Sequence, residues 1–145
     1  MGLKIVNKSN NPLPSYAHEG DAGMDIRAFI NEPITLLPGK RALIGTGLHI
    51  QLPRGFECQI RSRSGLSIKH GVCVLNGVGT IDCGYTNEIG VILINLGEEP
   101  FVINSGDRIA QMVFAALAEV KEFDLVEMLD ETERGEGGFG STGIK

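Results

Sequence analysis

One acidic and one phenolic side chain, Asp82 and Tyr85, stand in a glycine-rich stretch that runs from Asn76 to Glu88. The glycines at positions 77, 79 and 84 can take backbone angles forbidden to other residues, so a flat ligand can lie against main-chain N–H and C=O groups. We therefore predict a hairpin that carries the reacting centre and reads a base through its backbone. The alternative for this stretch alone is an ordinary hairpin, in which Asp82 caps a turn and Tyr85 fills a core edge.

A second stretch, from Arg61 to Gly71, has the features of a phosphate site. Its pattern predicts one short helix with Ser64 as the N-cap and Gly71 at the end. Free backbone N–H groups at the start of that helix would converge with the positive charges of Arg61 and Arg63. No Gly-Lys-Ser/Thr follows, so this is no Walker loop. A capped helix with solvated arginines is the alternative interpretation.

Two further polar residues stand out within predicted strands. Asp25 lies on one side of a strand over 22–28, where an isolated aspartate favours a structural hydrogen-bond acceptor over a metal-shell ligand. Gln111 lies between Ala110 and Met112, and a buried glutamine must find a backbone or ligand partner.

The stretch from Arg134 to Gly143 holds five glycines and one large apolar residue, Phe139, so it cannot build a core of its own. Its glycines match G-x-G-x-x-G, but too few residues follow for a dinucleotide-binding unit. It is either a frayed tail or a flap that orders over a phosphorylated, ring-bearing ligand.

Short strands separated by turns are the elements that must position these residues. Strands are predicted over or near 3–6, 22–28, 55–60, 72–75, 89–96, 101–103 and 109–114, and the pattern of 34–52 predicts a turn and two strands, with alternation over 48–52. The run 89–96 is apolar on both faces, which predicts a central strand packed on both sides or against a neighbouring subunit. The segment 120–129 is ambiguous between a strand and a short helix.

The whole chain has the size and composition of one folded domain with many turns. It has 145 residues, of which 42% are hydrophobic and 21% charged, with 20 glycines and 6 prolines. We predict an all-β domain over 1–130, followed by a flexible glycine-rich arm over 131–145.

The net charge of −5 offers no basic field for nucleic acid or an anionic membrane. A local excess of +3 between Leu52 and His70 suits a small polyanion instead. The three cysteines are odd in number and form no C-x-x-C pair, which favours buried thiols in a reducing, cytoplasmic location. We expect no membrane span and no nucleic-acid partner.

Five stretches together resemble the homotrimeric all-β deoxyuridine triphosphate nucleotidohydrolases (dUTPases), over Ala22 to Gly143. The five motifs of that family appear in order, as residues 22–28, 63–67, 76–88, 106–111 and 134–143. Each motif is weak by itself, but five in order at fitting separations are very specific.

The resemblance implies a distorted jelly-roll or β-sandwich-like barrel with one short helix, a homotrimer with shared active sites, and a C-terminal arm that closes over a site. It also implies Mg²⁺ as cofactor and hydrolysis of dUTP to dUMP and pyrophosphate, which limits uracil incorporation in DNA and supplies dUMP for thymidylate synthesis.

The roles of single residues also follow from the resemblance. It implies that Asp82 is the general base for the water that attacks the α-phosphorus, that Tyr85 packs under the deoxyribose, and that Asp25 holds waters of the Mg²⁺ shell. It implies that the following residues bind substrate: Arg63, Ser64, Gly65, Asn76, Gly79, Thr80, Ile81, Gln111, Arg134, Phe139, Gly140, Ser141 and Thr142. Within the arm, Phe139 would stack on the uracil.

Two departures from the family pattern concern turn geometry. Asn87 stands where the family usually has glycine, so the turn raises the question of a left-handed backbone angle there. Ser62 stands where proline is common in the family.

Two other functions remain open. One is deamination of dCTP, by the related group that shares the fold, although the placement of Asp82 and the glycine-rich arm argue against it. The other is a nucleotide-binding regulator that holds dUTP without turnover.

Overall fold

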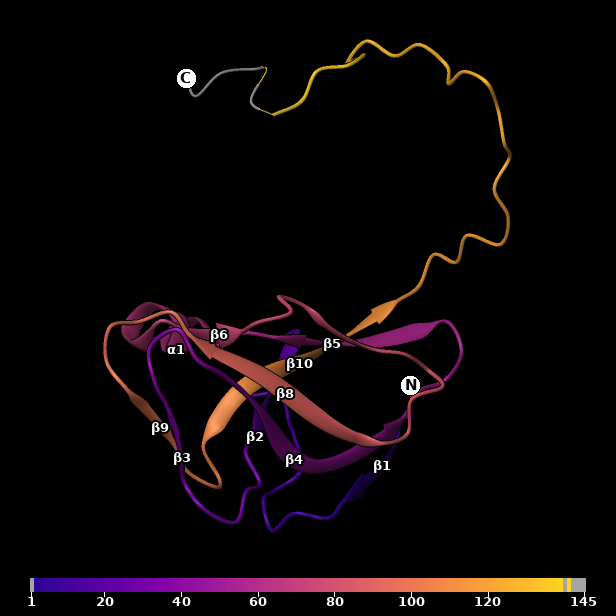
Figure 1. Cartoon of the computed structure of the whole chain (residues 1–145). Helices are drawn as coiled ribbons and strands as arrows, with labels where there is room; N and C mark the ends of the chain where they lie inside the picture. The colour runs from indigo at the N-terminus through magenta and orange to yellow at the C-terminus, as the bar shows by residue number, and fades with distance from the viewer. Residues whose placement is uncertain (1, 140, 142–145) are drawn as a thin grey trace.

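Ten strands and one short helix make up the regular structure of residues 2–139 and 141, which are the residues described by this computed structural model (Figure 1). Seven pairings join the strands, and all seven are antiparallel. The prediction of an all-β fold with one short helix is therefore confirmed.

The strands form two four-stranded sheets and one two-stranded sheet. The first sheet has the order β1-β4-β8-β6, with β1 over Lys4–Asn7, β4 over Arg41–Gln51, β8 over Glu88–Asn95 and β6 over Val72–Val74. The second has the order β2-β10-β5-β7, with β2 over Gly23–Arg27, β10 over Arg108–Ala116, β5 over Phe56–Arg61 and β7 over Gly79–Ile81. The small sheet pairs β3, Ile34–Leu36, with β9, Phe101–Ile103.

Aliphatic side chains from both large sheets form one core, as alternation along the strands requires. Strand β8 is internal to its sheet, as predicted, and its odd-numbered residues Ile89, Val91 and Leu93 are fully buried. The other face of β8 is only half-buried, so a single chain packs this strand on one side and not on two.

The single helix, α1, spans Ser64–His70. Ser64 is not its N-cap: Arg63 occupies that position with an extended backbone and no side-chain capping bond, so this part of the prediction was wrong. Gly71 ends the helix as predicted, at φ 68°, with its N–H donating to the carbonyls of Leu66 and Ser67.

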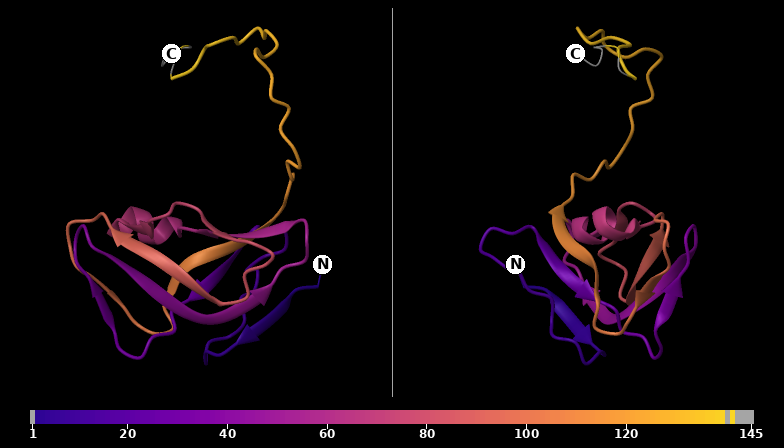
Figure 2. Two further views of the ribbon diagram at one scale, coloured as in Figure 1. Left: turned by 45° about the vertical axis from the view of Figure 1, so that its right-hand side comes forward. Right: turned by 90° about the vertical axis from the view of Figure 1, so that its left-hand side faces the viewer.

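The segment after β10 leaves the strands and rises away from them in both views of Figure 2. Residues 117–136 are exposed and contain neither a strand nor a helix, so the expectation of one of these over 120–129 was wrong. Exposed apolar side chains such as Phe123 and Leu125 lie along it, which is unusual for a chain that acts alone.

No helix in the described part of the chain is long and apolar enough to cross a membrane.

Candidate active site

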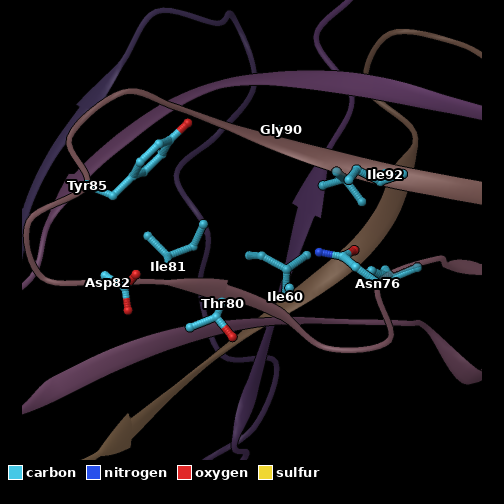
Figure 3. Close-up of a pocket in the computed structure, with 11 residues that line it drawn as sticks. Ile60, Asn76, Thr80, Ile81, Asp82, Tyr85, Gly90 and Ile92 are labelled. Carbon is cyan, nitrogen blue, oxygen red and sulfur yellow. The ribbon is translucent and has the colours of Figure 1, made fainter.

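The hairpin stretch lines a cavity of about 200 Å³ between β7 and β8 (Figure 3). This hairpin cavity contains six of the predicted site residues: Asn76, Gly79, Thr80, Ile81, Asp82 and Tyr85. Figure 3 shows Asn76 at one end and Asp82 with Tyr85 at the other. Ile60 and Ile81 lie between the two ends in Figure 3, and Val74 and Ile92 add to the aliphatic lining. A flat apolar body with polar groups at both ends fits this shape.

Gly79 is a position at which a side chain would crowd two lining residues of the cavity. Strand β7 pairs with β5, and Gly79 lies opposite Ile60. A Cβ atom at Gly79 would stand 3.1 Å from Ile60 Cβ and 3.4 Å from Asn76 Nδ2. The glycine therefore allows backbone, amide and wall to approach one another, which a backbone-read ligand needs.

A turn closes the other end of the hairpin, where the backbone N–H of Tyr85 donates to the carbonyl of Asp82 at 3.0 Å. The phenol hydroxyl of Tyr85 donates to the backbone carbonyl of Glu88 at 2.8 Å, and 42% of the residue is exposed. The ring is thus held at its far edge and leaves a face open.

Asn87 does not adopt a left-handed backbone angle, although the glycine usual at this position in the family raised that question. Within the described part of the chain, Phe139 is the only non-glycine residue with positive φ, at 49°. The turn therefore accommodates Asn87 without that strain, and its side-chain Oδ1 accepts a hydrogen bond from the N–H of Glu88 at 2.8 Å.

A second group of predicted residues gathers around Asp25 on the other sheet. Asp25 Oδ1 accepts from Arg63 Nε at 2.8 Å, and Asp25 Oδ2 accepts from Arg108 Nη1 at 3.1 Å. Gln111 lies opposite Asp25 in the pairing of β10 with β2, and its Nε2 donates to the carbonyl of Ser62 at 2.9 Å. We name Asp25, Arg63, Arg108 and Gln111 the Asp25 cluster.

Two hollows of about 370 and 340 Å³ lie beside the Asp25 cluster, and both are lined by Arg27 and Arg108. The larger hollow has two arginines against Asp21 and Asp25 and so no net charge. The smaller one has Arg27, Arg63 and Arg108 against Asp107, and this net positive charge suits an anion. Ser64 and Gly65 are exposed in the first turn of α1, directly after Arg63.

The hairpin cavity and the Asp25 cluster do not line the same cavity within one chain. None of the cavities described therefore brings a nucleotide whose base lies in the hairpin cavity to the Asp25 cluster of the same chain. A site that uses both groups would have to take them from different chains.

The arm residues that the structure describes, Arg134, Phe139 and Ser141, line neither the hairpin cavity nor the two hollows beside the Asp25 cluster. Arg134 Nε donates to the carbonyl of Gly137 at 3.0 Å, the N–H of Ser141 donates to the carbonyl of Gly138 at 3.0 Å, and Phe139 is fully exposed. Gly140 and Thr142 lie outside the described residues.

Sequence reasoning missed Arg108 and Glu88. Arg108 is 83 positions from Asp25, and nothing in the spacing of the two residues indicates that strands β2 and β10 bring them together. Glu88 had a signal, a carboxylate ending the hairpin stretch, but its partners lie on β4.

The described residues contain no group of three or more His, Cys, Asp or Glu side chains that could form a protein metal cage. Mg²⁺ rarely uses such a cage: it keeps several waters and takes one or two carboxylates plus substrate phosphates. Asp25 fits that use, since its two oxygens offer about four lone-pair sites and the arginines occupy two.

The three cysteines are free thiols, as predicted, but only Cys58 is buried; Cys73 and Cys83 are half-buried, so the expectation of buried thiols was wrong for these two. Burial, assisted by the negative charge of Glu57, raises the pKa of the Cys58 thiol from 9.0 to about 12. Cys58 is therefore protonated at neutral pH and is not a nucleophile.

Comparison with known families gives a match to the dUTPase family over residues 9–143. A relative from Finegoldia magna, named deoxyuridine 5'-triphosphate nucleotidohydrolase, is 54% identical over 99% of both chains. A protein of the same name from Chlamydia trachomatis is 53% identical over 94% of both chains.

Solved structures of phage enzymes have the same fold. A variant of the dUTPase of Staphylococcus bacteriophage 80alpha, in complex with dUpNHpp, has a TM-score of 0.84 at 27% identity and covers 99% of both chains. A variant of the dUTPase of phage phi11 of S. aureus, described with a structural Mg(II) ion, has a TM-score of 0.78 at 26% identity over 88% of this chain and 98% of the other.

Proposed function

This chain belongs to the dUTPase family, and on that premise we propose how it hydrolyses dUTP to dUMP and pyrophosphate. The observation that carries the proposal is the hairpin cavity, which has an amide at one end and a carboxylate and phenol at the other. Deoxyuridine has the matching distribution: a flat base with polar edges joined to a sugar that bears the reacting phosphate.

Base recognition uses Asn76 and the neighbouring backbone of β7. The amide of Asn76 can donate and accept, and the close approach at Gly79 brings main-chain groups to the same ring edge. A base that cannot pair with these groups leaves them buried and unsatisfied, which can cost roughly 10⁴–10⁵ in selectivity. Ile60, Val74 and Ile81 form part of the cavity wall and leave no space for the methyl group of thymine.

Tyr85 lies under the deoxyribose and excludes a 2'-hydroxyl group. The support is its position between Asp82 and β8 in the hairpin cavity, with the ring edge fixed by the hydrogen bond to Glu88.

Asp82 accepts the proton of the attacking water. As the water oxygen forms its bond to the α-phosphorus, the bond from that phosphorus to the bridging oxygen breaks and pyrophosphate leaves. The proton then resides on Asp82 Oδ and returns to solvent. Such a general base contributes on the order of 10²–10⁴-fold.

The triphosphate lies against basic donors, for which the Asp25 cluster and the exposed first turn of α1 at Ser64 and Gly65 are the candidates. Phosphoryl transfer requires positioning and charge neutralisation more than covalent help. A bound Mg²⁺ would neutralise charge on the phosphate oxygens, and Asp25 would hold it through water.

The active site is shared between copies in a homotrimer. The support is that the hairpin cavity and the Asp25 cluster do not line one cavity within a chain, and that the outer face of β8 is apolar and half-buried. The arm, with Arg134, Phe139, Gly140, Ser141 and Thr142, closes over the nucleotide as a third contribution.

The deciding experiment is pyrophosphate release from dUTP, dTTP, dCTP and UTP, each with and without Mg²⁺. We expect turnover of dUTP that Mg²⁺ accelerates, with the other three nucleotides slower by several orders of magnitude. Ammonia release from dCTP would indicate a deaminase, and saturable dUTP binding without pyrophosphate would indicate a regulator. Either result would contradict the proposal.

A further inference from the structure

Glu88 closes the hairpin stretch, and its carboxylate makes contacts that the reaction does not need. Its Oε1 accepts two hydrogen bonds from backbone N–H groups of β4, from Thr46 at 3.0 Å and from Gly47 at 2.8 Å. Hydrogen bonds with an ionised acceptor are roughly twice as strong as neutral ones. This carboxylate therefore joins the end of the hairpin to a strand far away in sequence.

The reason for these bonds is an irregularity in the pairing of β4 with β8. Gly45 lies opposite Gly90, whereas His49 lies opposite Glu88, so two steps along β8 correspond to four along β4. The residues between Gly45 and His49 have no residue paired with them on β8. At this point β8 offers no backbone carbonyl to the N–H groups of Thr46 and Gly47, and the Glu88 carboxylate accepts from them instead. Without that acceptor, these buried N–H groups would be left without a hydrogen bond, which costs free energy.

Gly45 and Thr46 on β4 leave space for the Glu88 carboxylate and add a further bond to β8. A Cβ atom at Gly45 would stand 2.8 Å from Glu88 Oε1, so only glycine leaves room for the carboxylate. Thr46 Oγ1 donates to the carbonyl of Ile89 at 2.6 Å, which ties the same bulge to the residue after Glu88. Both strands are thus fixed to each other at Glu88.

Glu88 does not line the hairpin cavity, but a hydrogen bond connects it to Tyr85, which does. Its backbone carbonyl accepts the hydrogen bond of the Tyr85 hydroxyl at 2.8 Å. Its carboxylate lines a separate hollow with Gly45 and Gly47, and it is absent from the lining of the hairpin cavity, so it is not a second base.

We propose that Glu88 is a positioning residue: its carboxylate fixes the peptide that holds the phenol of Tyr85, and it thereby sets how strongly the site rejects a ribonucleotide. The inference rests on the proposed function at one point, the placement of Tyr85 under the sugar. A loosened Tyr85 would admit a 2'-hydroxyl group that the fixed ring excludes.

The test measures kcat and KM for dUTP and UTP in the unmodified enzyme and in three variants. We expect Glu88→Ala to lower the preference for dUTP over UTP by about 10- to 100-fold, the loss typical of a displaced positioning contact. Glu88→Gln should retain most of the preference, because its amide oxygen can accept the same two hydrogen bonds. Gly45→Ala should behave like Glu88→Ala, since it displaces the carboxylate while keeping it in the protein.

The matched control is Glu98→Ala, which removes an exposed glutamate from the turn at the other end of β8 and should leave the preference unchanged. A combined Tyr85→Phe, Glu88→Ala enzyme should lose little more preference than Tyr85→Phe alone, because both changes break one connection.

The outcomes separate the two claims. If the unmodified enzyme does not distinguish dUTP from UTP, the proposed role of Tyr85 is wrong. If it does, but Gly45→Ala and Glu88→Ala keep the preference and lower only Tm, then Glu88 is a purely structural residue and the inference is overturned. Should Glu88→Ala fail to fold, the Gly45→Ala result decides.

Discussion

Asp25 and Asp82 are the two aspartates among the predicted site residues, and their side chains have different surroundings. Both oxygens of Asp25 accept hydrogen bonds from arginines, and its side chain is 35% exposed. Asp82 is exposed at the end of an aliphatic cavity, and no arginine pairs with it among the described residues. Both oxygens of Asp25 are thus occupied by guanidinium donors, whereas the carboxylate of Asp82 is open to water, which supports our proposal that Asp82 is the base.

We predict that Asp82→Asn lowers kcat for dUTP by about 10²–10⁴-fold while leaving KM within a few-fold, because an amide keeps the shape but cannot take the proton. Steady-state pyrophosphate release measures both constants. Glu32→Gln, which removes an exposed carboxylate outside the site, serves as control. A near-normal kcat in Asp82→Asn would assign the base to another group.

Cys58 gives a prediction about alkaline pH. Its folded-state pKa is raised to about 12 from 9.0, so the folded protein keeps a proton that the unfolded chain releases above pH 9. The contribution to stability is fully present below pH 9 and is lost as pH rises towards 12, by up to about 1.4 kcal/mol per pH unit.

Urea unfolding at pH 8, 9, 10 and 11 checks this. The free energy of unfolding should fall more steeply above pH 9 in the unmodified protein than in Cys58→Val, which fills the same buried space without a titrating group. Parallel pH profiles for the two proteins would show that this thiol does not contribute to the alkaline loss.

At the scale of elements, the strands could be predicted because alternation along a strand is local information. Strands over 101–103 and near 109–114 and 22–28 appear where the alternation placed them. The capping of α1 could not be predicted in the same way, because the N-cap is Arg63, which makes no side-chain capping bond and instead pairs with Asp25, 38 positions away in the sequence. Local preference for serine carries no information about such a partner.

Gly71 is the element-scale position at which one methyl group should be most damaging. Its φ is 68°, and a Cβ atom there would collide with the backbone of Gly97. We predict that Gly71→Ala lowers the free energy of unfolding by more than the roughly 1–2 kcal/mol expected from the left-handed angle alone.

Gly39→Ala is the matched control, since Gly39 has φ 73° and open space where its Cβ would be. The difference between the two variants in urea unfolding measures the collision with Gly97. Equal losses would mean that the turn after β8 moves aside without cost.

At the scale of the whole molecule, sequence motifs identified which residues to expect but not how one chain distributes them. Six of the predicted site residues share the hairpin cavity, while three others, Asp25, Arg63 and Gln111, lie together elsewhere. Motif order carries no distances, so it could not reveal this division. Nor could it reveal the Arg108 partner of Asp25, which depends on the pairing of β2 with β10.

The division predicts complementation between inactive chains. Asp82→Asn and Arg63→Ala chains should each be nearly inactive alone, but co-refolding them in equal amounts should restore activity. In an equal mixture, about half of the cavities come from chains that keep Asp82, and about half of the clusters come from chains that keep Arg63. If each site draws its cavity and its cluster from different copies at random, about a quarter of the sites are free of both substitutions.

Dilution of unfolded mixtures followed by a dUTP assay measures the recovered fraction, with co-refolded unmodified chains setting the maximum. An activity equal to the average of the two separate variants would show that each site is built within one chain, and the shared-site proposal would be wrong.

The bridging of two guanidinium groups by Asp25 has a consequence for competition between anions. Immobilising a long cationic side chain costs up to about 2 kcal/mol of conformational entropy. Asp25 already holds Arg63 and Arg108 in the folded protein, so ligand binding does not have to immobilise them. The same carboxylate cancels one of their two charges, which leaves one net positive charge on the pair for a free phosphate. A triphosphate placed at this cluster, as we propose, would span the pair and reach donors beyond it, so dUTP should bind here more tightly than orthophosphate.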